Sequence, residues 1–183
     1  MAKVGWVHAL KGPPMATVSA SDLPADSLLR PWLATATFWD SFDAPLADPS
    51  LAPIEILQRA SKATPDWAVS LMSIRNRVVK PLGLKTGPAF RAGVDRPAAD
   101  YEIGDRIGLF TLFAKTENEV VVGIDDRHLD VRVSVMKFAR AGAARFAFST
   151  VVKTHNLLGR LYMVPVGRIH PIIVWTLMNG AQV

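Results

Sequence analysis

The chain has 183 residues, about half of them hydrophobic and a fifth charged, with a net charge of +5 and an isoelectric point of about 9.8. This balance is typical of one folded domain with a substantial hydrophobic core. The lack of cysteine in these residues excludes disulfide bonds, thiolate nucleophiles and cysteine-ligated metal centres. The basic residues are scattered and have no interleaved aromatic residues, so we expect no nucleic-acid partner.

We expect residues 1–22 to be an irregular N-terminal segment and residues 23–183 to form a single domain. The N-terminus has no sustained apolar stretch followed by a small-residue cleavage site, so we predict no secretory signal and a cytoplasmic location. The most apolar run near the C-terminus, residues 172–178, is far too short to span a bilayer. No membrane-spanning segment is therefore expected.

Residues 35–44, TATFWDSFDA, mix β-branched and aromatic side chains, which predicts a first strand. The stretch that follows breaks this strand, and either Asp48 or Ser50 can cap a short helix that ends near Ala63. The sequence therefore predicts a strand followed directly by a helix.

A second helix is predicted to begin at Thr64 as N-cap, with Pro65 at its first position. Its apolar stripe consists of Trp67, Leu71, Ile74 and Val78. Pro81 and Gly83 are expected to end it. Residues 84–103 show no clean period, which predicts a long loop that is either a functional flap or a connector.

Short strands joined by polar turns follow, and this pattern predicts an antiparallel meander. The expected strands span residues 107–114, 120–124, 128–138 and 145–153. On the third of them, alternation places His128, Asp130, Arg132 and Ser134 on one face and Leu129, Val131, Val133 and Val135 on the other. The simplest sheet turns the aliphatic face towards a helix and the charged face towards water.

The longest predicted helix runs from His155, with Asn156 or Thr154 as cap, to about Asn179. An arc of about 120° holds its expected buried stripe, which is Leu158, Leu161, Tyr162, Pro165, Ile169, Ile172, Ile173 and Thr176. Pro165 and Pro171 should bend or divide this helix. The element order predicts an α+β helix-grip fold. In that fold a curved antiparallel sheet wraps around the C-terminal helix and leaves a cavity between them, and two short helices follow the first strand.

Several blocks of the sequence also resemble one family. The blocks are LPADSLLRPWL, WDSFDAPL, LMSIRNRVVKPLGL, GDRIGLF, DDRHLDVRVSV and STVVKTHNLLGRLYMV, between about residues 23 and 178. They are similar to the bacterial domain-of-unknown-function family 2867, and DDRHLD is the most recognisable of them. The resemblance implies a fold of the START-like, polyketide-cyclase-like superfamily and points to candidate site residues. It implies no particular reaction.

The DDRHLD block, residues 125–130, has two interpretations. In the first, Asp125 and Asp126 are turn residues and the rest is the solvated face of a strand, stabilised by small cross-strand ion pairs. In the second, His128 lies between Asp126 and Asp130 at a pocket mouth, where a carboxylate partner suits it to acid–base work. A metal site is not expected, because no second histidine lies at ligand spacing.

Two groups of candidate site residues follow. A catalytic role is assigned to none, although His128, Asp126 and Asp130 are the candidates for one. The candidate ligand-binding residues are Phe110, Phe148, Tyr162, Ile169, His155 and Arg132. Tyr162 lies on the expected buried stripe, so its hydroxyl needs a partner.

The sequence favours a domain that binds a small apolar or amphipathic ligand in a cavity between sheet and helix, with no cofactor or metal. Two alternatives stay open. One is an enzyme of the cyclase, dehydratase or isomerase type that uses His128 with Asp126 or Asp130. The other is a protein-interaction module that uses the charged face of the sheet. The sequence does not decide whether the chain is an enzyme or forms a homo-oligomer.

Overall fold

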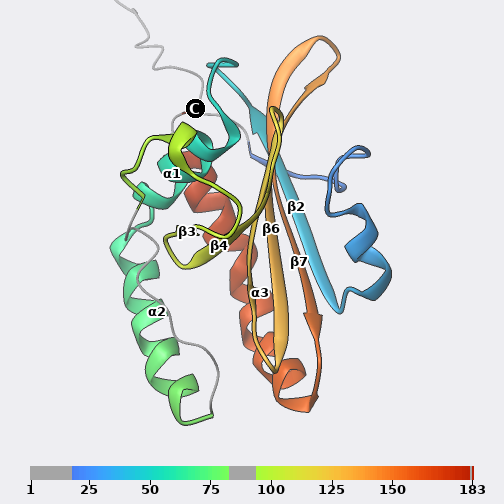
Figure 1. Ribbon diagram of the computed structural model, residues 1–183. Coiled ribbons are helices and arrows are strands. Elements are labelled where there is room, and N and C mark those ends of the chain that lie inside the picture. Colours follow the sequence, from blue (N-terminus) through green and yellow to red (C-terminus); the bar gives the residue numbers. More distant parts are fainter. Residues whose placement is uncertain (1–17, 83–93, 182) are drawn as a thin grey trace, which may run out of the picture.

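The computed structural model describes residues 18–82, 94–181 and 183 (Figure 1). In this part of the chain one antiparallel sheet of seven strands has the order β1-β2-β7-β6-β5-β4-β3. Its strands are β1 Ser19–Ala20, β2 Phe38–Pro45, β3 Arg106–Ile107, β4 Phe110–Lys115, β5 Glu119–Asp125, β6 Leu129–Arg140 and β7 Ala143–Thr154. The α-helices are α1 Pro53–Lys62, α2 Asp66–Val79 and α3 Leu157–Gly180, and the 3₁₀ helices are η1 Arg30–Thr35, η2 Lys80–Leu82 and η3 Ala98–Asp100.

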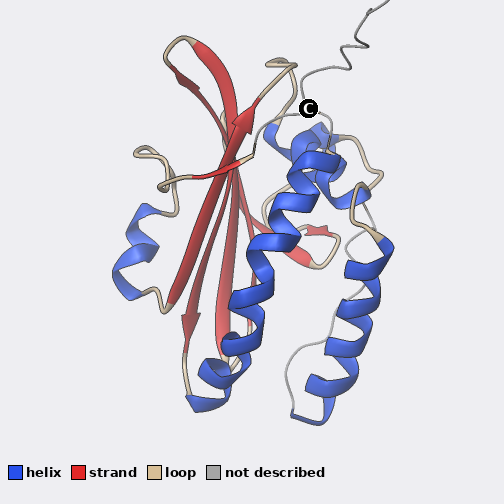
Figure 2. Ribbon diagram, turned by 180° about the vertical axis from the view of Figure 1, so that it is seen from behind, coloured by secondary structure: helices blue, strands red, loops and turns tan. Residues whose placement is uncertain are grey.

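The three α-helices lie on one side of the sheet, and η1 lies on the other (Figure 2). The long helix α3 runs along β2 and β7, while α1 packs over β5 and β6. This arrangement confirms the predicted α+β helix-grip class, with two helices between the first long strand and the meander.

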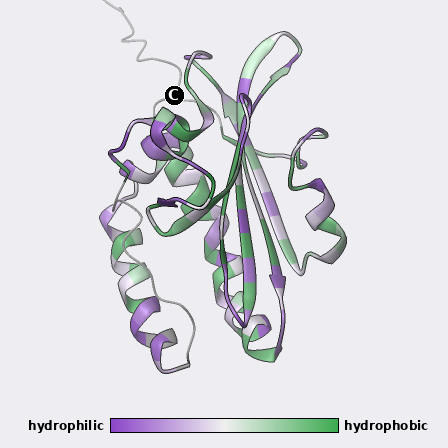
Figure 3. Ribbon diagram, viewed as in Figure 1, coloured by the Kyte–Doolittle hydropathy of each residue, from purple (hydrophilic) through white to green (hydrophobic). Residues whose placement is uncertain are grey.

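The alternation predicted for β6 and β7 correctly identifies the face that meets the helices. Figure 3 shows hydrophilic and hydrophobic residues alternating along the long strands. Leu129, Val131 and Val133 of β6 lie on the α3 side, as do Phe148 and Thr150 of β7. The pairing of β6 with β7 is continuous from Leu129↔Thr154 to Arg140↔Ala143, so the same face stays buried along both strands.

The tightly packed core occupies one end of this layer. Val135, Phe146, Ile56, Val174 and Met178 are buried there, where α1 and the last turns of α3 meet the sheet. Between Tyr162 and Leu177, α3 also lines the cavity described below.

The prediction that the opposite, charged face of the sheet is open to water is wrong. Residues 21–36 cover it, and Leu23 and Leu29 form a second buried cluster with Val121 and Val151. Arg132 is only 6% exposed in this layer. Its guanidinium lies between the rings of Trp32 and Phe113, 4.4 and 3.7 Å from their centroids.

The charges of this covered layer are satisfied internally. Arg132 forms an ion pair with Asp125 at 2.6 Å. The buried Glu119 carboxylate accepts hydrogen bonds from the hydroxyls of Ser27 at 2.7 Å and Ser134 at 2.5 Å, and from the amide of Leu28 at 2.8 Å. Such bonds offset the cost of burying a carboxylate.

Several element boundaries differ from the sequence prediction. The N-cap of α2 is Pro65 and not Thr64, and β1 lies in the segment expected to be irregular. Residues 107–114 do not form one strand, because β3 and β4 make a hairpin in which Ile107 pairs with Phe110 and Gly108 turns with a φ of +58°. The cap of α1 is Ala52, whose amide donates to Glu55 at 2.6 Å, and neither Asp48 nor Ser50 caps it. Asp48 instead accepts from Ser50, whose hydroxyl and amide hold the pKa of Asp48 below its usual value.

The helix α3 begins where one alternative of the sequence analysis placed its cap, at Asn156, whose side chain accepts from the amide of Gly159 at 3.0 Å. Pro165 and Pro171 do not divide it, since both lie within a single helix.

The predicted stripe of α3 is the inward face only in part. Tyr162, Pro165, Ile169 and Ile173 line the cavity, but Leu161 and Ile172 are 59% and 58% exposed. Gly167 and His170, which are not in that stripe, face Phe38 and Asp40 of β2. The helix is apolar on its outer face too, where Leu157, Leu161, Val164, Ile172 and Trp175 are exposed. Hydrophobic periodicity alone therefore had too little contrast to identify the packed face.

The length and composition of α3 also meet the criteria for a membrane-spanning helix, the one helix among the described residues to do so. A single such helix is weak evidence, because core helices of water-soluble proteins meet the same criteria. The prediction of no membrane span stays a prediction.

A close approach at Gly159 sets the position of the first turn of α3. A Cβ at this position would overlap the backbone oxygen of His128, so no side chain fits there without a shift of the backbone. We therefore expect Gly159→Ala to lower the free energy of unfolding in urea by about 1–3 kcal/mol. Gly167→Ala is the matched control on the same helix, because its Cβ would meet only the movable ring of Phe38, at 3.2 Å. Equal unfolding free energies for the two variants would contradict this role of Gly159.

Candidate functional site

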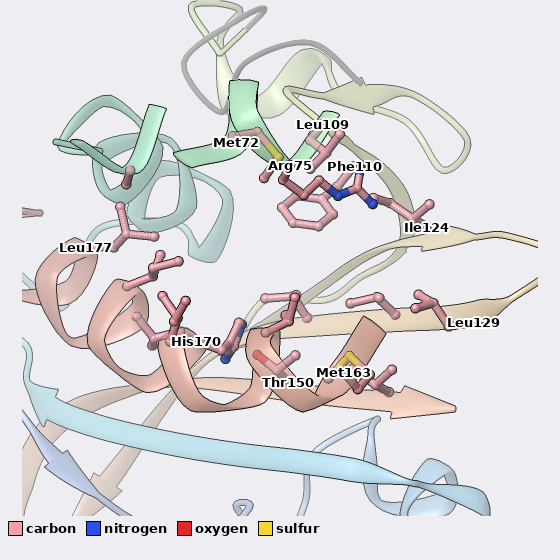
Figure 4. Close-up of a pocket in the computed structure, with 18 of the residues that line it drawn as sticks. Met72, Arg75, Leu109, Phe110, Ile124, Leu129, Thr150, Met163, His170 and Leu177 are labelled. Atoms are coloured by element: carbon pink, nitrogen blue, oxygen red, sulfur yellow. The ribbon is translucent and has the colours of Figure 1, made fainter. Parts of the chain in front are cut away.

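A cavity of about 610 Å³ lies between the sheet and α3 (Figure 4). Most of its wall is apolar. The sheet contributes Phe38, Phe110, Ile124, Leu129, Val131, Val133, Phe148 and Val152, and α3 contributes Met163, Pro165, Val166, Ile169, Ile173, Val174 and Leu177. The helix α3 packs along β2 and β7, and the cavity lies where the aliphatic face of β6 is left open.

The wall opposite the sheet is completed by α2. Ala68, Leu71 and Met72 line the cavity, while Trp67 is 45% and Ile74 58% exposed. Of the predicted stripe of α2, Leu71 and Ile74 line the cavity and Trp67 does not. The side chain of Val78 lies outside the described residues.

The charged residues of the cavity lie at its rim. Arg106 and Asp125 are exposed, and Arg75 and Asp126 are half-buried. Arg75 crosses from α2 to α3, where its Nε donates to the hydroxyl of Tyr162 at 3.0 Å and its guanidinium lies 5.3 Å from the ring centroid. This contact supplies the partner that the Tyr162 hydroxyl was expected to need.

His128 lies outside the cavity, buried against the start of α3. Arg127 donates from Nε to its Nε2 at 2.8 Å, and its Nδ1 lies 3.2 Å from the side-chain oxygen of Asn156. With both ring nitrogens engaged by neighbouring side chains, His128 joins the turn before β6 to the cap of α3.

The carboxylates of DDRHLD do not converge on His128. Asp126 accepts from the backbone amide of His128 at 3.2 Å, and Asp125 pairs with Arg132. Asp130 pairs with Nε2 of His155 at 3.0 Å. This geometry matches the first interpretation of DDRHLD, a turn followed by one face of a strand. The difference is that this face of the sheet is largely covered by residues 21–36.

The predicted ligand-binding residues divide into two groups. Phe110, Phe148, Tyr162 and Ile169 all line the cavity. Arg132 and His155 do not, because Arg132 points to the opposite face of the sheet and His155 pairs with Asp130 beyond the end of β7. The structure brings the four lining residues together from β4, β7 and α3.

Sequence reasoning missed a pair on the cavity wall. Nδ1 of His170, on α3, lies 2.7 Å from Oδ2 of Asp40, on β2. A signal for it was present in the first strand: Phe38, Asp40 and Phe42 share one face, and an acid between two aromatic residues on a buried face requires a partner. The predicted buried stripe of α3 did not include His170, so the sequence analysis did not place this residue against the sheet.

A family model described as a protein of unknown function, DUF2867, matches residues 32–177. The chain belongs to the DUF2867 family. Among solved structures, one titled "Crystal structure of Ara h 8.0201" matches with 14% identity and a TM-score of 0.29, over 79% of this chain and 98% of that one. The comparison with curated proteins found no match.

Two features of this DUF2867 chain bear on its chemistry. Within the described residues no group of three or more histidine and acidic side chains is arranged to hold a metal ion. The match also contains DDRHLD, the block that was expected to carry chemistry, and in the structure this block secures the contact between β6 and α3. The prediction of no metal stays a prediction.

If His128 is a structural residue, its removal should affect stability. We expect His128→Ala to lower the free energy of unfolding by about 1–3 kcal/mol, because Asn156 and Arg127 lose a buried partner. His155→Ala, which removes a partly exposed ion pair with Asp130, should change it by no more than about 0.5 kcal/mol. Chemical denaturation of both variants measures the difference. A fully stable His128→Ala protein would contradict the structural role.

Proposed function

We propose that this chain is a small-molecule-binding protein whose cavity between the sheet and α3 takes an apolar or amphipathic ligand. The observation that carries the proposal is the cavity itself, with its volume of about 610 Å³. Pockets for small molecules typically measure about 300–1,000 Å³ and combine an apolar wall with a few polar groups.

The distribution of polarity supports a ligand with one apolar body. Side chains such as Val131, Phe148 and Ile169 line the interior, while the exposed charges of Arg106 and Asp125 stand at the rim. An apolar molecule gains about 25 cal/mol per Å² of apolar surface removed from water, so such a wall provides affinity without directional contacts. A polar end of an amphipathic ligand would meet the rim.

The two alternatives drawn from the sequence have less support. An enzyme based on His128 needs that ring in contact with a substrate, and both of its nitrogens are engaged by Arg127 and Asn156 outside the cavity. An interaction module based on the charged face of the sheet needs that face exposed, and residues 21–36 cover it.

A cavity-filling substitution tests the proposal. We expect Ile169→Trp, which points a larger side chain into the cavity, to weaken binding of the fluorescent probe anilinonaphthalene sulfonate by at least about tenfold. Ile172→Trp is the matched control, the same substitution on the exposed side of α3 at a position that is 58% exposed. Fluorescence titration measures both, and native mass spectrometry of the purified wild-type protein reports any retained ligand.

The proposal fails if the wild-type protein binds neither the probe nor any co-purifying molecule. It fails equally if Ile169→Trp, folded as judged by its thermal unfolding, binds the probe as the wild-type protein does.

A further inference from the structure

The pair formed by His170 and Asp40 is the part of the cavity wall with the strongest directional chemistry. A carboxylate can only accept a hydrogen bond, so the 2.7 Å contact places a proton on Nδ1, and in the neutral imidazole Nε2 is then an acceptor. The two side chains are 23% and 12% exposed. The ring of Phe38 meets His170 edge-on at 5.9 Å and limits its rotation.

Only one member of the His170–Asp40 pair lines the cavity. His170 is part of the wall (Figure 4). Asp40 is not among the lining residues, and its carboxylate contacts the imidazole from β2. The second oxygen of Asp40, Oδ1, is buried and has no hydrogen-bond partner among the described residues. Asp40 therefore depends on His170 for its pairing.

Thr150 provides a second polar group at this place. Its Cα pairs with that of Asp40 across β2 and β7, and its side chain lines the cavity. Within the part of the chain described here the Thr150 hydroxyl forms no hydrogen bond, although the residue is only 3% exposed. A hydroxyl in that position is available to a molecule in the cavity.

His170 and Thr150 are polar groups in an otherwise apolar part of the cavity wall. Phe38, Val152, Val166 and Ile173 line the neighbouring surface. The other titratable or charged residues of the lining are Arg75 on α2, Tyr162 near the start of α3, Arg106 on β3, Asp125 at the end of β5, and Asp126 after it.

We propose that Nε2 of His170 accepts a hydrogen bond from a hydroxyl group, phenolic or enolic, of an otherwise apolar ligand, with the Thr150 hydroxyl as a second contact. Asp40 is the positioning residue that fixes the tautomer. A hydroxyl both donates and accepts, which matches an acceptor nitrogen beside a threonine hydroxyl. A carboxylate ligand would instead need donors, and the arginines of the lining lie at the rim. This inference rests on the proposed function and assigns a ligand class to the same cavity.

A matched pair of probes tests it. Naphthol carries the hydroxyl, and methoxynaphthalene has the same ring with the donor replaced by a methyl ether. We expect the wild-type protein to bind naphthol about tenfold more tightly than methoxynaphthalene, since one good hydrogen bond in an apolar site has that effect. His170→Phe should bind both probes equally and keep the affinity for methoxynaphthalene.

Two further variants keep the test decisive. Thr150→Val has almost the same shape as the wild-type side chain and should reduce the preference for naphthol several-fold without disturbing the fold. His155→Phe changes a histidine outside the cavity and should keep the full preference. If His170→Phe does not fold, Thr150→Val decides the test.

The outcomes separate the two proposals. Binding of methoxynaphthalene with no preference for naphthol in the wild-type protein would overturn the role of His170 and leave the cavity as a binding site. An unchanged preference in His170→Phe, or in Thr150→Val where that variant decides, would overturn it as well. Failure of both probes to bind the wild-type protein would overturn the proposed function together with this inference.

Discussion

The architecture depends on how α3 is held against the sheet at its two ends. At the first turn Gly159 approaches the backbone oxygen of His128 so closely that only a glycine fits. At the last turns Val174 and Met178 enter the packed core under α1, and Gly180 lies against Ala63. Between these ends Gly167 and His170 contact Phe38 and Asp40 of β2, while the aliphatic face of β6 stays open. The space between that face and α3 is the cavity.

The residues on the two faces of the sheet are shielded from water in different ways. On the helix side the aliphatic residues of β6 border a cavity, so part of their surface is left available to a ligand. On the other side residues 21–36 close over the strands, and the buried charges of Arg132 and Glu119 are satisfied by partners within the chain. A covered face whose buried charges are paired offers little to a partner, while a cavity lined by methyl groups and rings gains from being filled.

The DDRHLD block shows how a charged cluster can serve structure. Asp126 orders the turn, Asp125 reaches Arg132, and His128 meets the cap residue of α3. These structural roles need short acceptors and a ring with two polar atoms, which are also the groups of an acid–base site. Composition alone cannot separate the two uses. The two uses differ in whether the ring nitrogens of His128 are free. That depends on the adjacent Arg127 and on Asn156, which is 28 positions away in the sequence.

The order of the main elements, the antiparallel meander and the buried face of β6 were determined by the sequence itself, and the cap of α3 was narrowed to Asn156 or Thr154. Local chemistry decides them, through side-chain alternation in strands and the preference of asparagine for a helix start. The hairpin at Gly108 was missed because a two-residue turn inside an apolar run leaves almost no signal in composition.

Only the tertiary structure decided which sides of α2 and α3 face inward, that residues 21–36 cover the charged strands, and that His170 meets Asp40. The helix α3 is apolar nearly all round, so the energy of turning one side or another inward differs little by hydrophobicity alone. What selects the orientation of α3 is the steric fit of Gly159 and the polar contact between His170 and Asp40, which join residues up to 130 positions apart. Such contacts leave no periodic pattern in the sequence, because they form only when the helix packs against the sheet.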